Sequence, residues 1–220
     1  GFATGNAVLR DHERELGAVL IDIGASITEI TVFWGNNIKF TEIIPIGGDY
    51  ITESISKELK VSLEYAELIK KRFGCVSSKK IPESEKFILK DGRYQRSITK
   101  KYFCETIEPT INDMLSQIKS RIDKLRFLKK VTFGVVFSGG TSLMEDFLEV
   151  ADEILGMPVR IGTARDIFSN RENANNYEYL TSIGLVKHGL LKKYKRINPV
   201  SFTFLDRIKY KCKELIEEYF

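Results

Sequence analysis

The chain has 220 residues, of which 43% are hydrophobic and 29% charged, as expected of a globular protein with a sizeable core. Its 34 basic and 30 acidic residues give a net charge of +4, too small to favour a nucleic-acid-binding protein. Three widely separated cysteines favour a reducing compartment over a disulfide scaffold. No apolar run approaches the roughly 20 residues of a membrane-spanning helix. The first residue is a glycine, so we expect a piece of a longer protein.

Residues 1–16 are expected to form the end of an earlier element and a charged connector, with a solvent-exposed turn over 11–15. The next stretch, GAVLIDIGASITEITVF, joins two β-forming runs through a turn of small residues, which predicts a β-hairpin. A second tight turn, Asn-Asn, follows. We therefore expect three antiparallel strands, at about 17–24, 27–34 and 37–46.

An acidic residue and a glycine end the first of these strands, and hydroxyl residues lie in and after the turn. Such a turn can direct backbone N–H groups at a phosphate, while the carboxylate holds a hydrated divalent cation. The motif is not of the Walker type, because no Gly-Lys-Ser/Thr follows and the turn leads into a strand rather than a helix.

The region over 49–100 is predicted to contain two helices and a hairpin. Asp49 is expected to cap a helix over 52–59, and a second helix begins near residue 63 and stops at Gly74. Glu67 and Lys70 share one face of the second helix, where an exposed ion pair and a functional pair are equally expected. The sequence Asp-Gly at 91–92 predicts a hairpin between polar β-forming runs.

The rest of the chain alternates helices and strands. The expected elements are a long helix over 101–128, a buried central strand over 131–137, a helix over 144–155, an edge strand over 158–162, a helix over 179–191, a basic loop over 192–199 and a last helix over 202–220. Together with the N-terminal strands they predict an α/β fold with a mixed sheet.

The last predicted helix is amphipathic, with a basic first half. It fits either a helix packed on the domain or a helix on a membrane surface. The residues that would contact the membrane are Phe204, Leu205, Ile208, Lys209, Leu215, Ile216 and Tyr219.

Four segments, in this order and spacing, resemble the actin-like ATPase superfamily, and within it the second half of the bacterial cell-division family FtsA. They read GAVLIDIGASITEITVF, PIGGD, AELIKKRFG and VFSGGTSLMEDFLEVADEILGMPVRIG. The resemblance covers about 11–190 and implies an actin-like (ribonuclease H-like) fold that lacks its N-terminal half. The implied parts are a connector (1–16), a nucleotide-cleft sheet subdomain (17–48 and 101–190), a small inserted α+β subdomain (49–100), a linker (191–200) and an amphipathic C-terminal helix (201–220).

The resemblance also implies a site for ATP and magnesium between the two halves of the protein, with Asp22 near the metal. The implied cofactor-binding residues are Asp22, Gly24, Ser26, Thr28, Glu67, Lys70, Gly139, Gly140 and Thr141. The family loop reads Asp-x-Gly-Gly-Gly-Thr-Thr-Asp, whereas here Ala25, Ser26, Ile27 and Glu29 replace glycine, glycine, threonine and aspartate. Because Cβ atoms restrict positive φ and Ile27 lacks a hydroxyl, we expect weak ATP binding with slow or no hydrolysis in the intact protein. This chain alone should not bind nucleotide tightly.

The implied partners are the C-terminal tail of FtsZ, further copies of the protein in an actin-like polymer, and the cytoplasmic face of the cell membrane at the division septum. Arg93, Arg96, Lys100 and Lys101 are the candidate FtsZ contacts. The family's Glu-Pro-Arg reads Glu-Pro-Thr at 108–110, so one expected cation is missing.

Other members of the superfamily remain as alternatives: a sugar kinase, a pilus-assembly ATPase or a shape-determining filament protein. A kinase needs a catalytic carboxylate near a sugar pocket, and nothing over 49–100 indicates one. The amphipathic C-terminal segment favours the division protein, and no catalytic residue is predicted.

Overall fold

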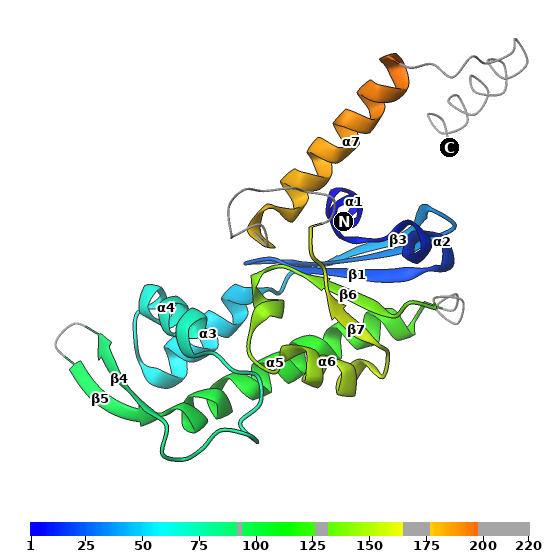
Figure 1. The fold of residues 1–220 in the computed structure, drawn as a ribbon. Coiled ribbons are helices and arrows are strands. Elements are labelled where there is room, and N and C mark those ends of the chain that lie inside the picture. The colour runs from blue at the N-terminus through cyan, green and yellow to red at the C-terminus, as the bar shows by residue number, and fades with distance from the viewer. Residues whose placement is uncertain (92–93, 126–131, 165–176, 198–220) are drawn as a thin grey trace, which may run out of the picture.

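The computed structural model describes residues 1–91, 94–125, 132–164 and 177–197. Its centre is a five-stranded sheet with the order β3-β2-β1-β6-β7 (Figure 1). The strands are β1 (Ala18–Ile23), β2 (Thr28–Trp34), β3 (Asn37–Ile44), β6 (Val135–Ser138) and β7 (Val159–Ile161). The first three pair antiparallel, whereas β6 lies parallel to β1, and β7 parallel to β6. This confirms the predicted mixed sheet and its three antiparallel N-terminal strands.

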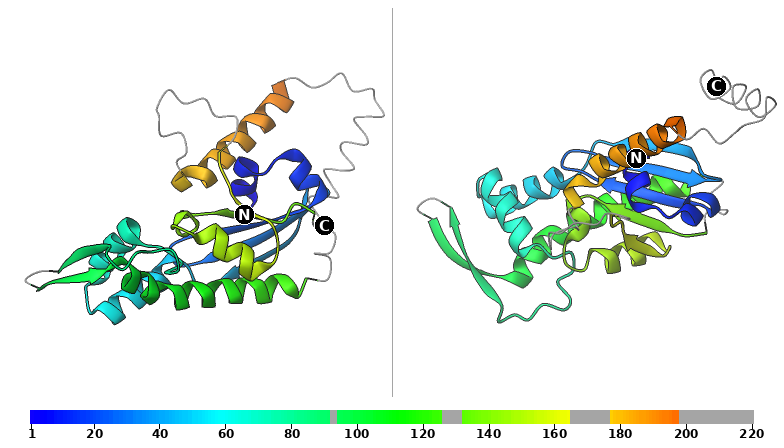
Figure 2. Two further views of the ribbon diagram at one scale, coloured as in Figure 1. Left: turned by 60° about the horizontal axis from the view of Figure 1, so that its bottom comes forward. Right: turned by 45° about the horizontal axis from the view of Figure 1, so that its top comes forward.

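Helices cover both faces of the sheet (Figures 1 and 2). On one face lie α5 (Lys100–Asp123) and α6 (Phe147–Leu155), and on the other lie α1 (Phe2–Val8) and α7 (Leu180–Ile197). Alternate residues of β1 divide between the two faces. Val19, Ile21 and Ile23 belong to the core with α5 and α6, whereas Ala18 and Leu20 pack with α1. The near-continuous apolar run of β1 is thus explained by burial on both sides.

A small lobe extends beside the sheet and comprises α3 (Gly48–Leu59), α4 (Leu63–Phe73), β4 (Lys86–Asp91) and β5 (Tyr94–Thr99) (Figure 1). The stacked rings of Phe73 and Phe87, with centroids 4.1 Å apart, join α4 to the hairpin. Phe103 of α5 meets Phe87 edge-on at 5.4 Å. Helix α4 ends at Gly74 and β4 pairs antiparallel with β5, as predicted.

The start of α3 corrects one prediction. The helix begins at Gly48 rather than at residue 52, and Gly47 rather than Asp49 is its N-cap. The N–H groups of Gly48 and Asp49 donate to the carbonyls of Gly24 and Ala25, at 2.9 and 2.7 Å. The turn after β1 therefore accepts hydrogen bonds from the first N–H groups of the helix. This contact joins residues far apart in the chain, so it could not be predicted from the sequence around the helix start.

The N-terminal connector is also more ordered than predicted. It forms α1 and a second short helix, α2 (Asp11–Leu16), in place of a solvent-exposed turn. Glu13 of α2 is 5% exposed and forms a bidentate pair with Arg160 of β7, with Nε–Oε1 and Nη2–Oε2 distances of 2.9 and 2.6 Å. Burial raises the pKa of Glu13, but the hydrogen bonds and charge of Arg160 and the N–H of Arg10 hold it below its usual value.

Three further boundaries differ from the sequence prediction. Strand β6 starts only at Val135, because Gly134 has a φ of +74° that interrupts the extended run. Helix α6 begins at Phe147, after a 3-10 turn, η2 (Gly140–Leu143), and a left-handed Asp146. Helix α7 continues to Ile197, so most of the loop expected over 192–199 is helical.

Two predicted regions lie outside the described residues: Arg93 and the amphipathic segment over 201–220. Among the helices that the structure describes, none has the length and apolar character needed to cross a membrane.

Candidate functional site

Two neighbouring parallel strands, β1 and β6, end at the same edge of the sheet. Asp22 and Ser138 are partners in their register, and each strand is followed by a glycine-containing turn. The first turn of α3 reaches the same edge, since Gly48 donates its N–H to the Gly24 carbonyl. Crevices at the carboxyl ends of parallel strands are common ligand sites. We call this region, formed by 22–28, 47–52, 67–70 and 138–141, the cleft-edge site.

The turn after β1 is closed by a hydrogen bond from the Gly24 N–H to the Ile27 carbonyl, 2.9 Å long. Ser26 Oγ donates to the Asp49 carboxylate at 2.6 Å, so the turn and α3 hold each other. The turn is solvent-exposed, and within the described residues the N–H groups of Ala25 and Ser26 donate to no other group. These two donors remain free for the oxygens of an anion.

Asp22 is half-buried and accepts a hydrogen bond from Thr4 Oγ1 of α1 at 3.1 Å. The Thr4 hydroxyl also lies 3.0 Å from that of Thr181 on α7. On the neighbouring strand, the buried Ser138 Oγ has no hydrogen-bond partner among the described groups. A half-buried carboxylate such as that of Asp22 fits a cation that keeps its water shell, which is the usual state of protein-bound Mg²⁺.

No group of three or more His, Cys, Asp or Glu side chains in the described ranges is arranged to hold a metal ion. The residues present fit a nucleotide phosphate and its hydrated cation.

Lys70 lies beneath the N-terminus of α3, with a side chain that is only 9% exposed. Its Nζ donates to the Gly48 carbonyl at 2.9 Å and to Thr52 Oγ1 at 2.8 Å, and it pairs with Glu67 Oε2 at 2.6 Å. Thr52 Oγ1 in turn donates to Glu67 Oε2 at 2.6 Å. Lys70 thus supports α3 directly, and the more exposed Glu67 is the member of the pair that a ligand can reach.

The pKa of Glu67 is set by two opposing effects. Partial burial raises it, but hydrogen bonds from Lys70 and Thr52, and the charge of Lys70, outweigh burial and place the pKa below its usual value. The carboxylate therefore stays ionised, and the pair remains a charged unit.

The two predicted loop glycines have different roles in the structure. Gly139 has a φ of +90°, and a Cβ there would lie 2.0 Å from the Ile23 carbonyl oxygen, so the fold itself demands glycine. At Gly140, a Cβ would meet nothing within 4 Å, which leaves open space beside the backbone. Thr141 is buried, and its Oγ1 would lie 3.0 Å from a Cβ on Gly48, so the β6 turn and α3 are in close proximity.

Thr28, also predicted in this site, points elsewhere. It is fully buried and its hydroxyl donates to the Ile46 carbonyl at 2.8 Å, which ties β2 to the chain after β3. Asp49 and Ser138, which lie within the site, and Thr4, which borders it, were not among the predicted site residues. Glycine pairs next to Asp49 and Ser138 were the available signals, whereas Thr4 lies in a stretch without any motif.

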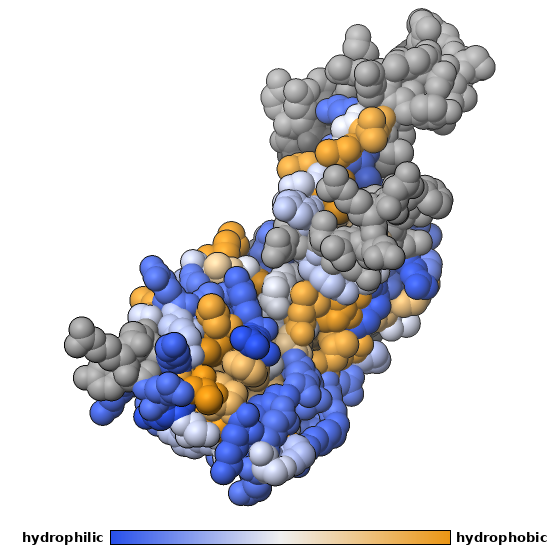
Figure 3. Space-filling model, turned by 60° about the vertical axis from the view of Figure 1, so that its left-hand side comes forward, coloured by the Kyte–Doolittle hydropathy of each residue, from blue (hydrophilic) through white to orange (hydrophobic). Residues whose placement is uncertain are grey.

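The three predicted partner-binding cations that the structure describes already have contacts. Arg96 Nη2 donates to the Leu59 carbonyl at the end of α3 (2.6 Å), and Lys101 pairs with Glu83 (2.7 Å). Lys100 pairs with Glu145 and Glu85, at 2.9 and 3.4 Å. The surface of this lobe is largely hydrophilic, with apolar patches between the polar side chains (Figure 3).

Sequence comparison decides the family. A family model described as "Cell division protein FtsA" matches residues 19–184, which include every residue of the cleft-edge site. The chain belongs to the FtsA family. Among similar relatives, FtsA of Pseudomonas aeruginosa is 33% identical over 194 residues, which are 87% of this chain and 46% of that protein. FtsA of Neisseria meningitidis serogroup B is 32% identical over 188 residues, covering 84% of this chain and 45% of that protein. The chain thus spans about half the length of the FtsA proteins that it matches.

Solved structures confirm the actin-like fold. MreB5 of Spiroplasma citri bound to AMPPNP matches with a TM-score of 0.71 and 15% identity, over 90% of this chain and 60% of that one. The MamK double helical filament matches with a TM-score of 0.61 and 15% identity, over 84% and 57% of the two chains. These likenesses establish the fold. Membership of the FtsA family then decides against the sugar-kinase, pilus-assembly and shape-determining alternatives.

Proposed function

We propose that this chain is the nucleotide-holding second half of an FtsA, a scaffold that links FtsZ filaments to the cytoplasmic face of the cell membrane at the division septum. The observation that carries the proposal is the meeting of four segments of an FtsA-family chain at one sheet edge: the β1 turn, the β6 turn, the start of α3, and the Glu67–Lys70 pair. We further propose the division into a sheet subdomain (17–48 and 101–190) and a small subdomain (49–100).

The nucleotide would be ATP. The free N–H groups of Ala25 and Ser26 would bind its phosphates, and the open backbone at Gly140 would lie beside its adenosine part. Asp22 would face the hydrated magnesium ion, whose charge would offset that of the phosphates. The actin-like relative MreB5 was solved with AMPPNP, which supports a nucleotide in this fold.

Two side chains of the turn after β1 would make ATP hydrolysis slow or absent. The Ser26 hydroxyl already donates to Asp49, so it would not be available to hold an attacking water molecule. Ile27 is 46% exposed and offers no hydroxyl to orient a water molecule. ATP would therefore serve to hold the two halves of the protein together rather than as a rapidly consumed substrate.

The membrane and partner contacts belong to other parts of the chain. The amphipathic segment over 201–220 would lie on the membrane, the small lobe would bind the FtsZ tail, and copies of the protein would assemble as an actin-like polymer. The existence of a filament of the actin-like relative MamK supports assembly.

Vesicle recruitment tests this scaffold role. Full-length protein and FtsZ are floated with vesicles that contain anionic lipid, and the two controls are protein without residues 201–220 and FtsZ without its tail. We expect FtsZ at the vesicles only when both segments are present. Recruitment that survives either deletion would refute the corresponding contact.

A further inference from the structure

Two hydroxyl groups connect Asp22 of the cleft-edge site to helices α1 and α7. Thr4 of α1 is 1% exposed, and its Oγ1 donates to Asp22 Oδ2 at 3.1 Å. The same Thr4 oxygen lies 3.0 Å from Oγ1 of Thr181, in the first turn of α7. We call these three residues the Asp22 network. It joins two helices on one face of the sheet to the carboxylate at the end of β1.

The direction of the hydrogen bonds in the Asp22 network follows from the chemistry of its groups. A carboxylate only accepts hydrogen bonds, so the single proton of the Thr4 hydroxyl is used on Asp22. Thr181 is therefore the donor in its bond with Thr4, and successive hydroxyls in such a series polarise one another. Within the described residues Asp22 Oδ1 accepts no hydrogen bond, which leaves this oxygen for the water shell of a cation.

Close packing holds α1 between the sheet and α7, and the two helices lie side by side (Figures 1 and 2). A Cβ on Gly184 of α7 would lie 1.7 Å from the carbonyl oxygen of Ala3, so the helices touch through backbone atoms. A Cβ on Gly5 would lie 2.4 Å from Cζ of Phe33 on β2. Helix α1 therefore cannot shift without breaking these contacts, and the Asp22 network is built on rigid elements.

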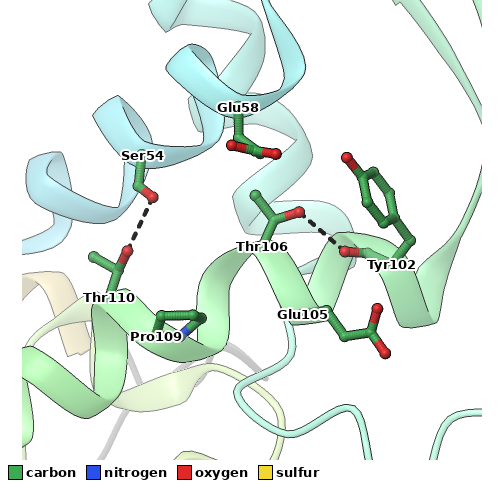
Figure 4. Close-up of a pocket in the computed structure, with 7 residues that line it drawn as sticks. All are labelled: Ser54, Glu58, Tyr102, Glu105, Thr106, Pro109 and Thr110. Atoms are coloured by element: carbon green, nitrogen blue, oxygen red, sulfur yellow. Dashed lines mark hydrogen bonds between the residues drawn. The ribbon is translucent and has the colours of Figure 1, made fainter.

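A second pair of hydroxyls shows what is particular to the Asp22 network. Ser54 of α3 and Thr110 of α5 bond at 2.9 Å beside a pocket of about 310 Å³ in the small lobe (Figure 4). This pair also bridges two helices, but in the described part of the chain neither of its hydroxyls bonds to a carboxylate. Bridging two helices thus requires no carboxylate, so the bond from Thr4 to Asp22 has a separate role.

We propose that Thr4 is a positioning residue, which orients the Asp22 carboxylate toward the hydrated cation of a bound nucleotide, and that Thr181 couples this orientation to α7. The inference rests on the proposed function, because it takes Mg²⁺ with ATP as the group that Asp22 faces. A buried donor on Oδ2 fixes the rotation of the carboxylate, as outer hydrogen bonds commonly do around metal sites. Because coupling is reciprocal, nucleotide binding stabilises α7, the last described helix before the amphipathic segment over 201–220.

The first arm of the test measures the Mg²⁺ concentration that half-saturates binding of a fluorescent ATP analogue to the full-length protein. Thr4→Val replaces the hydroxyl with a methyl group, Thr4→Ser keeps the hydroxyl, and Thr110→Val is the matched control. We expect Thr4→Val to need roughly threefold to tenfold more Mg²⁺ yet to reach the wild-type maximum, and the other two variants to stay within about twofold of wild type. An unchanged Mg²⁺ midpoint in Thr4→Val, with or without a lower maximum, would overturn the positioning role.

The second arm measures hydrogen exchange of the α7 amides over 180–190 with and without Mg²⁺ and the ATP analogue. We expect the ligands to slow exchange roughly twofold or more in wild type, and far less in Thr181→Val. The control Ser182→Ala, which removes the exposed hydroxyl of the next residue, should behave as wild type. Equal slowing in Thr181→Val and wild type would overturn the coupling to α7.

The two arms also separate this inference from the proposed function. Wild-type protein that binds no nucleotide would refute the proposed function, and the role of Thr4 toward the cation with it. Wild-type protein that binds nucleotide, with Thr4→Val and Thr181→Val indistinguishable from it in both arms, would refute this inference alone.

Discussion

The cleft-edge site and the surface around the β4–β5 hairpin and the start of α5 hold their polar groups in different ways. In the cleft-edge site, backbone groups of the β1 turn and α3 bond directly to each other, glycines allow close approach, and Lys70 is buried under the helix. Around the hairpin and the start of α5, Lys101 pairs with Glu83, whose side chain is 81% exposed. The polar groups of the first region are packed, whereas those of the second are solvated.

This difference predicts where the protein is sensitive. A buried hydrogen-bonded charge leaves unpaired groups behind when it is removed, whereas an exposed ion pair is replaced by water. An added methyl group likewise lowers the free energy of unfolding where backbone atoms already fill the space, and changes it little where the space is open. The following substitutions test the contrast in order of expected effect.

The largest effect is expected for Gly139→Ala. Its φ of +90° and the Ile23 carbonyl oxygen 2.0 Å from the new Cβ require the β1–β6 contact to shift. We expect a loss of about 2–4 kcal/mol in the free energy of unfolding, measured by urea denaturation. The matched control, Gly140→Ala, adds a Cβ into open space and should change stability by less than about 1 kcal/mol. Equal losses in the two variants would contradict the account.

Lys70→Met should have the next largest effect. It leaves the Gly48 carbonyl and the Glu67 carboxylate without their buried partner, at a cost of about 2–3 kcal/mol. Lys71→Met serves as control, because Lys71 also pairs with Glu67, at 3.3 Å, but its side chain is 73% exposed. The control should lose less than about 0.5–1 kcal/mol in the same denaturation experiment. If Lys71→Met lost as much unfolding free energy as Lys70→Met, burial of the lysine would not explain the stability that the Glu67 pair contributes.

The pH dependence of stability sharpens this comparison. The folded-state pKa of Glu67 lies below its usual value, so its ion pair stabilises the protein fully above the unfolded-state pKa and less as pH falls through the folded-state pKa. We expect the stability difference between wild type and Lys70→Met to shrink as the pH is lowered from about 5. A difference that stays constant over this acid range would contradict the assigned role of Glu67.

Lys101→Met should have the smallest effect. Its pair with Glu83 is exposed to water, and we expect no measurable change in the free energy of unfolding by urea denaturation. A loss as large as that of Lys70→Met would mean that the surface of the small lobe contributes to stability far more than its exposure implies.

Much of the fold follows from patterns that are local in the sequence. The alternation around the β1 turn predicts the three antiparallel strands, Asp-Gly predicts the β4–β5 hairpin, and Gly74 marks the end of α4. In each case the signal lies within a few residues of the structure that it determines.

The features that were missed depend on distant contacts. Helix α3 starts four residues earlier than predicted, because Gly24 and Ala25, more than 20 residues away, accept its first N–H groups. Glu13 is buried rather than solvated, because Arg160 lies opposite it. The same holds for the site, where motifs indicated Asp22 and the Gly139 turn but not the bond between Ser26 and Asp49.

The most direct test of the account is nucleotide binding by the full-length protein, measured with a fluorescent ATP analogue alongside phosphate release. We predict saturable, magnesium-dependent binding that Asp22→Asn weakens, together with phosphate release far slower than a typical enzyme turnover of about 10 s⁻¹. Brisk magnesium-dependent phosphate release, or binding that Asp22→Asn leaves unchanged, would contradict the proposal that this site holds ATP without rapidly consuming it.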